Sequence, residues 1–81
     1  MASIANAPRA DLKATEYFLL AQEGVLDASV WYTEGDMVAN IVVFDGMTVR
    51  AEDLQRACLV ELGAHQTPKS IMLMNARKRI A

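Results

Sequence analysis

The chain has 81 residues, of which 53% are hydrophobic, and its eight basic and ten acidic side chains give a net charge of −2. A chain of this length forms one domain at most and buries only about 60% of its unfolded surface, so we expect part of its apolar surface to meet another surface. The charge balance excludes the strongly basic class of nucleic-acid-binding proteins. No apolar run approaches the roughly 18 residues that span a membrane.

The only cysteine, Cys58, cannot form an internal disulfide, which fits a reducing compartment. The N-terminus lacks the pattern of a secretory signal, so we expect a cytoplasmic location. Residues 1–10 predict a flexible tail. Good helix formers then run from Leu12 to Gln22. Leu12 and Leu19 share one face of this predicted helix, Phe18 lies on another, and Gly24 ends it.

Two strands joined by a hairpin are predicted next. Residues 25–33 alternate in polarity, with Trp31 on one face and Tyr32 on the other, which is typical of a half-buried strand. Residues 34–36 form the turn, where Gly35 can adopt a positive φ. Residues 37–44 are almost continuously apolar, which predicts the most buried strand of the sheet.

A second helix is predicted from Ala51 to Leu62, with an apolar stripe along one side that includes Cys58. Pro68 prevents the helix from continuing, and a last strand follows. Ile71 and Leu73 face one side of that strand, whereas Met72 and Met74 face the other. The predicted order is α-β-β-α-β in an α/β (α+β) fold, with a three-stranded mixed sheet packed with helices. Residues 11–75 form the single domain, and residues 76–81 form a basic tail.

Few side chains are candidates for catalysis or metal binding. Cys58 and His65 are the only thiol and the only imidazole, and they allow either a nucleophile–base pair or a buried core thiol beside a loop histidine. The apolar neighbours of Cys58 on its own helix face favour the second interpretation. One histidine, one cysteine and scattered carboxylates do not supply the ligands of a metal site, so we expect no metal and no cofactor.

Two surfaces are candidates for contact with a partner. Trp31, Met72 and Met74 share one face of the predicted sheet, and they form either an interaction surface or a face covered by a helix of the same chain. Arg77, Lys78 and Arg79 form a short basic tail that either contacts a phosphate or an acidic partner or is simply solvated.

Three segments together resemble the small C-terminal domain of the adenylate-forming enzymes, which include acyl-CoA synthetases, fatty-acid ligases and the adenylation domains of peptide synthetases. Residues 16–30 contain Glu16, Leu19, Gly24 and Val25, similar to the family's Glu-x-x-Leu-x-x-His-Pro-Gly-Val before its first strand. Residues 35–43 read Gly-Asp-Met-Val-Ala-Asn-Ile-Val-Val, similar to Gly-Glu-x-Val-x-Ala-x-Val-Val. Residues 65–71 read His-Gln-Thr-Pro-Lys-Ser-Ile, similar to Tyr-Lys-x-Pro-x-x-Ile.

The resemblance covers residues 11–75, and the sequence departs from the family at both ends. Residues 8–11 do not reproduce the hinge that precedes the first helix, and the family's large adenylating domain has no counterpart. The family's catalytic lysine follows a glycine downstream of the last strand, whereas Lys78 follows Arg77 after a shorter spacer. The resemblance therefore implies the fold and the ancestry, and it weighs against ligase activity by this chain alone.

Four hypotheses follow from the sequence. The first is a non-catalytic module that acts by contact with an adenylating enzyme, a carrier protein or a second copy of itself in a homodimer. The second is a split ligase in which Lys78 is supplied in trans. The third is a ferredoxin-like binding or regulatory domain with a small-molecule pocket lined by Trp31 and Tyr32. The fourth is a gene remnant that still folds.

Overall fold

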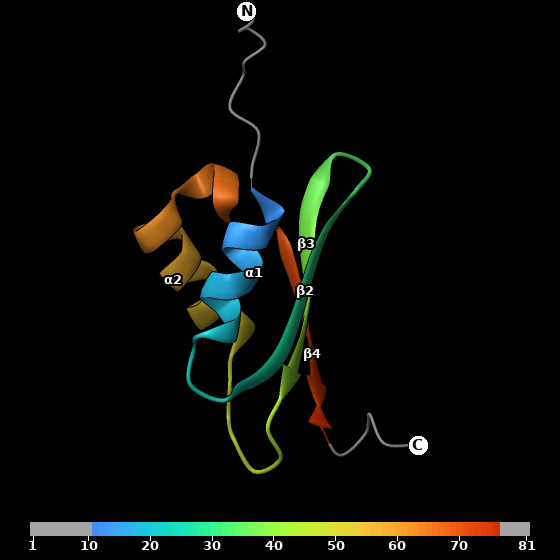
Figure 1. Ribbon diagram of the computed structural model, residues 1–81, viewed down its shortest axis with the longest axis vertical. Coiled ribbons are helices and arrows are strands. Elements are labelled where there is room, and N and C mark those ends of the chain that lie inside the picture. The colour runs from blue at the N-terminus through green and yellow to red at the C-terminus, as the bar shows by residue number, and fades with distance from the viewer. Residues whose placement is uncertain (1–10, 77–81) are drawn as a thin grey trace, which may run out of the picture.

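A computed structural model describes residues 11–76 (Figure 1). Helix α1 (Leu12–Leu20) precedes the hairpin of strands β2 (Val25–Thr33) and β3 (Asp36–Val43). Helix α2 (Ala51–Leu62), the short 3-10 helix η1 (Ala64–Gln66) and strand β4 (Ser70–Asn75) complete the order. The predicted α-β-β-α-β arrangement is therefore confirmed. No helix within residues 11–76 is long and apolar enough to cross a membrane.

The three strands form one mixed sheet in the order β2-β3-β4. β2 pairs antiparallel with β3, and β4 pairs parallel with β3 because α2 carries the chain back to the start of the sheet. Both helices lie on the same face of this sheet (Figure 1). The central strand β3 is the most buried, as its nearly continuous apolar sequence predicts.

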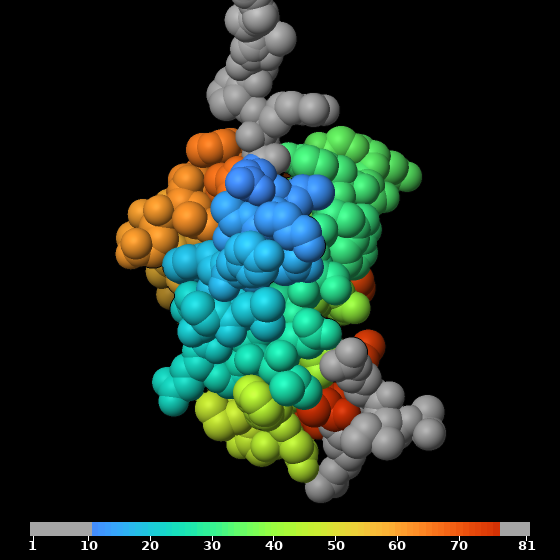
Figure 2. Space-filling view, viewed as in Figure 1, coloured from blue at the N-terminus to red at the C-terminus, as the bar shows by residue number. Residues whose placement is uncertain are grey.

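The core fills the space between the helices and the sheet. Leu19 from α1 and Leu54 and Cys58 from α2 meet buried sheet residues there. The sheet residues of this cluster are Val25, Ala28, Ala39, Ile41 and Val43. In the space-filling view the side chains of α1 lie between the η1 segment and the β2–β3 hairpin (Figure 2). Two of these sheet residues are small: Ala28, which pairs with Ile41, and Ala39, which pairs with Val30. Their small side chains allow the helices to approach the sheet closely.

The start of α1 is held from two directions. The Asp11 carboxylate accepts hydrogen bonds from the backbone N–H groups of Lys13 and Ala14, which caps the helix. The Gln66 side chain accepts from the backbone N–H of Asp11 and donates to its carbonyl oxygen. Thr15, which is fully buried, donates to the Gln66 carbonyl and accepts from its side-chain amide, both at 2.9 Å. The Asp11–Thr15–Gln66 group is the main buried polar network of the described chain.

Candidate functional site

The sheet has an open face, opposite the helices, which we define by its paired residues. Trp31 pairs with Val38, Met72 with Asn40, and Met74 with Val42. Paired residues of neighbouring strands point to the same side of a sheet, and the odd-numbered residues of β3 point to the core. The open face therefore contains Trp31, Val38, Asn40, Val42, Met72 and Met74. Neither α1 nor α2 covers it (Figure 1).

The three residues that the sequence singles out lie on this face but do not form one cluster. Trp31 is on β2, whereas Met72 and Met74 are on β4, and β3 separates them by two strand spacings of about 4.8 Å each. Their exposed fractions are 38% for Trp31, 55% for Met72 and 39% for Met74. Neither α1 nor α2, the two α-helices of the described elements, covers these side chains, and a role for them in contact with a partner stays a prediction.

Two further members of the open face, Val38 and Val42, were missed from the sequence. Val38 lies between Trp31 and Ser70, and Val42 lies between Asp27 and Met74. The continuous apolar run of β3 hides which of its residues point to which side. The pairing of Trp31 with Val38 shows that the even-numbered residues of β3 point to the open face. This pairing is known only from the register of the hairpin.

Cys58 and His65 do not form a reactive pair. Cys58 is completely buried on the core side of α2, and burial raises the pKa of its thiol to about 11. The thiolate is the nucleophilic form, so this environment suppresses reactivity. His65 is exposed in η1. The buried core thiol beside a loop histidine is therefore the interpretation that agrees with the structure.

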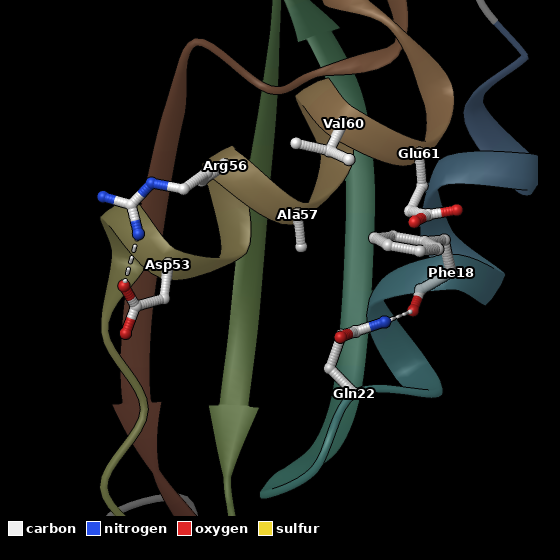
Figure 3. Close-up of a pocket in the computed structure, with 7 residues that line it drawn as sticks. All are labelled: Phe18, Gln22, Asp53, Arg56, Ala57, Val60 and Glu61. Carbon is white, nitrogen blue, oxygen red and sulfur yellow. Dashed lines mark hydrogen bonds and ion pairs between the residues drawn. The ribbon is translucent and has the colours of Figure 1, made fainter.

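A groove of about 510 Å³ lies between the two helices (Figure 3). The Phe18 ring reaches from α1 toward Ala57 and Val60 of α2 and forms its apolar part. Gln22 donates from its side-chain amide to the Phe18 carbonyl oxygen at 2.9 Å. The lining residues are Phe18, Gln22, Asp53, Arg56, Ala57, Val60 and Glu61. One signal for this groove is present in the sequence, namely the position of Phe18 off the main apolar face of α1.

The groove contains charged side chains but no nucleophile–base pair. Arg56 donates to the Asp53 carboxylate at 3.2 Å, and this ion pair lies on the side of α2 away from Phe18 (Figure 3). Both side chains are more than half exposed, so the pair contributes little to stability. The groove can accept a small apolar group beside Phe18. Neither this groove nor a smaller one beside Val49 and Leu54 contains Trp31 or Tyr32.

The predicted basic tail of Arg77, Lys78 and Arg79 lies outside the described residues. Within residues 11–76, no group of three or more histidine, cysteine or acidic side chains is placed to hold a metal ion. The candidate surfaces of the described chain are thus the open sheet face and the groove between the helices. Of the two, the open face presents the larger side chains for contact.

Comparison with known proteins gives similarity in structure but not in sequence. No family model matches the chain, and no curated protein matches it significantly. Solved structures do match. IdnL1 superimposes with a TM-score of 0.77 at 22% identity, over 83% of this chain and 14% of that one.

Two other solved structures give the same result. The acyl-CoA synthetase of Brucella canis matches with a TM-score of 0.70 at 22% identity, over 78% of this chain and 13% of that one. The amide bond synthetase McbA from Marinactinospora thermotolerans matches with a TM-score of 0.70 at 24% identity, over 78% of this chain and 14% of that one. The chain thus spans about one seventh of the length of these proteins. Its fold is that of the C-terminal portion of adenylate-forming enzymes.

Proposed function

We propose that this chain is a non-catalytic module that binds the adenylating domain of an acyl-CoA synthetase-like enzyme through its open sheet face. The observation that carries the proposal is a sheet face that neither described helix covers and on which Trp31, Met72 and Met74 are exposed, in a fold that otherwise forms about one seventh of a larger enzyme. Tryptophan and methionine are enriched in the cores of protein interfaces. The burial of the one thiol and the absence of a nucleophile–base pair in the groove support a role in contact rather than in chemistry.

The proposal places the module in the cytoplasm, where a single reduced cysteine is stable. Trp31 is expected to supply the largest share of the binding energy, because it presents the largest apolar side chain on the open face. The neighbouring residue Tyr32 pairs with the core-side residue Met37 and therefore points to the opposite face of the same strand. These two aromatic residues offer a matched comparison of the two faces.

Titration calorimetry against an acyl-CoA synthetase whose own C-terminal domain has been removed tests the proposal. We expect saturable binding that Trp31→Ala weakens at least about tenfold, since loss of a tryptophan that anchors an interface costs more than about 1.4 kcal/mol. Tyr32→Ala, at a residue that is 47% exposed, should change the affinity by less than about twofold. Absence of binding, or equal losses for the two variants, would contradict the proposal.

The same mixture separates this proposal from the split-ligase hypothesis. The rate of the adenylation half-reaction is measured with the complete chain and with Lys78→Ala. A module that acts by contact alone should give the same rate with either chain. A loss of the half-reaction at unchanged affinity would show that Lys78 takes part in the chemistry and would overturn the non-catalytic assignment.

A further inference from the structure

The outer edge of β4 is the part of the sheet with the most exposed apolar side chains. Within residues 11–76, β4 is an edge strand, and its six residues carry no charge. Leu73 pairs with the core residue Ile41 and so points to the helix side, yet it is 40% exposed because the helices do not cover this end of the strand. Met72 and Met74 are similarly exposed on the open face. Both sides of β4 therefore present apolar surface at the same edge.

The backbone of β4 also presents hydrogen-bonding groups at this edge. The Met37 carbonyl accepts from the Lys69 N–H at 2.8 Å, while the Phe44 N–H donates to the Gly24 carbonyl at 3.0 Å. The backbone N–H and C=O groups of the odd-numbered β3 residues therefore face β4, and those of the even-numbered residues face β2. In a parallel pair, the β4 residues that lie opposite these odd-numbered β3 residues direct their own N–H and C=O groups away from β3. Ile71 and Leu73 are such residues, and their backbone groups face outward.

The other edge of the sheet is protected in a way that β4 is not. β2 has a register shift between Val25 and Asp27, which places a bulge at Leu26, and Asp27 adds a charge. Bulges and charged side chains are the usual means by which edge strands avoid pairing with other chains. Neither occurs between Ser70 and Asn75. A row of outward backbone groups on an uncharged, unbulged strand fits another extended strand.

We propose that two copies of this chain pair through antiparallel contact of their β4 strands, which joins their sheets into one. An antiparallel arrangement about a two-fold axis uses the same surface on both copies. It also places the two Lys69 side chains at opposite ends of the contact, whereas a parallel arrangement would place these like charges side by side. In this dimer the helices of both copies lie on the same side of the joined sheet. Leu73 then lies against Ile71 or Leu73 of the second copy.

The size of this contact determines how tightly the copies associate. Pairing along one six-residue strand falls at the low end of specific interfaces, below about 1,200 Å², where association is weak and reversible. The dimer is therefore expected to form with rising concentration and to exchange with the monomer. This inference does not depend on the docking of an adenylating domain, although Met72 and Met74 belong both to the open face and to the paired strand.

Sedimentation equilibrium of the complete chain from about 10 µM to about 1 mM tests the pairing, a range that brackets weak association. We expect the molar mass to rise from 8.9 kDa toward twice that value. Leu73→Lys, which puts like charges at the contact, should keep the chain monomeric throughout the range. Met72→Lys, at a more exposed position, should do the same and guards against a folding defect in the first variant.

Two control variants identify the surface that is used. Trp31→Lys changes the open face at the far strand, and Val60→Lys changes α2 at a side chain that is 73% exposed. Both should dimerise like the original chain, and circular dichroism should show that all four variants are folded. A chain that stays monomeric at about 1 mM, or whose dimer survives both β4 substitutions, would overturn the proposal. A dimer abolished by Trp31→Lys would instead indicate stacking of open faces and would also overturn it.

Discussion

Gln66 joins two parts of the chain that are 51 to 55 residues apart, since its side chain bonds the backbone of Asp11 and the hydroxyl of Thr15. It is buried, so no water can replace these bonds when they are lost. Unsatisfied buried polar groups cost about 1–3 kcal/mol each. The network is therefore expected to contribute more to stability than any ion pair among the described residues, all of which are exposed to solvent.

We predict that Gln66→Leu lowers the free energy of unfolding by about 2–3 kcal/mol, because it leaves the Asp11 N–H without its acceptor and removes the hydrogen bonds of the Gln66 amide to the Thr15 hydroxyl and the Asp11 carbonyl. Gln55→Leu is the matched control. Gln55 also donates to backbone carbonyls, those of Pro68 and Lys69, but its position allows water to replace the bonds. Its loss should cost less than about 1 kcal/mol in urea denaturation. Equal costs would show that burial does not determine the value of these bonds.

Cys58 gives the stability of the protein a dependence on alkaline pH. Its pKa is raised from 9.0 to about 11 in the folded chain by burial, so the unfolded chain loses the proton first as the pH rises. Stability is therefore unaffected by this group below about pH 9 and falls by at most about 1.4 kcal/mol per pH unit between the two values.

We predict that Cys58→Ala removes this component of the alkaline loss. The variant should be less stable by about 1 kcal/mol at neutral pH because of the small cavity, and its difference from the original chain should shrink or reverse toward pH 11. Denaturation curves at several pH values measure the difference, in which contributions common to the two proteins cancel. A difference that stays constant with pH would show that the thiol is not held protonated by the fold.

At the scale of the elements, two glycines with the same backbone conformation differ in their surroundings. Gly24, between α1 and β2, has φ +89°, and Gly35, in the β2–β3 turn, has φ +84°. A Cβ at Gly24 would lie 2.8 Å from the Val49 side chain, whereas a Cβ at Gly35 would have no atom within 4 Å. The first position is constrained by both conformation and space, and the second by conformation alone.

We predict that Gly35→Ala costs about 1 kcal/mol, which is the strain of a positive φ in a residue with a Cβ. Gly24→Ala should cost about 1–3 kcal/mol more because Val49 must move out of the close-packed region below α1. Thermal unfolding of the two variants gives the comparison directly. Similar midpoints would indicate that Val49 moves aside freely.

Most elements were predictable from the sequence because their patterns are strong. The bounds of β2 and α2 agree with the alternation of residues 25–33 and with the apolar stripe of residues 51–62. Three local features were not predictable. α1 ends at Leu20, before the helix-forming residues run out; Glu34 adopts a positive φ of 53° beside Gly35; and η1 forms before Pro68. The η1 turn depends on the burial of Gln66, a tertiary contact that outweighs local preference, whereas the positive φ of Glu34 follows from the two-residue turn between β2 and β3.

At the scale of the whole molecule, the alternation of β4 and β2 was enough to place Trp31, Met72 and Met74 on one face, but not to place them relative to each other. That needed the strand order and the register, which leave β3 between them. The groove beside Phe18 required the relative position of α1 and α2, which no sequence pattern gives. The face to which a side chain points is thus set locally by the alternation of the strand. Which side chains lie next to each other is set by the complete fold.

The proposed pairing of β4 strands makes stability depend on concentration. A dimer that forms only from folded chains stabilises them by mass action. We predict that the midpoint of thermal unfolding rises by about 3–5 °C for each tenfold increase in concentration once the dimer predominates. Calorimetric scans at several concentrations measure this, with Leu73→Lys expected to show no change. A midpoint that rises equally in that variant would point to association through another surface.

The hydrogen bonds between Gln66 and Asp11 also have a mechanical consequence. Asp11 is the point where the chain enters the domain, and Gln66 lies two residues before Pro68, where the chain turns into β4. A pull on Asp11 should therefore be resisted by these bonds as well as by the first turn of α1, and part of it should pass to the loop before β4.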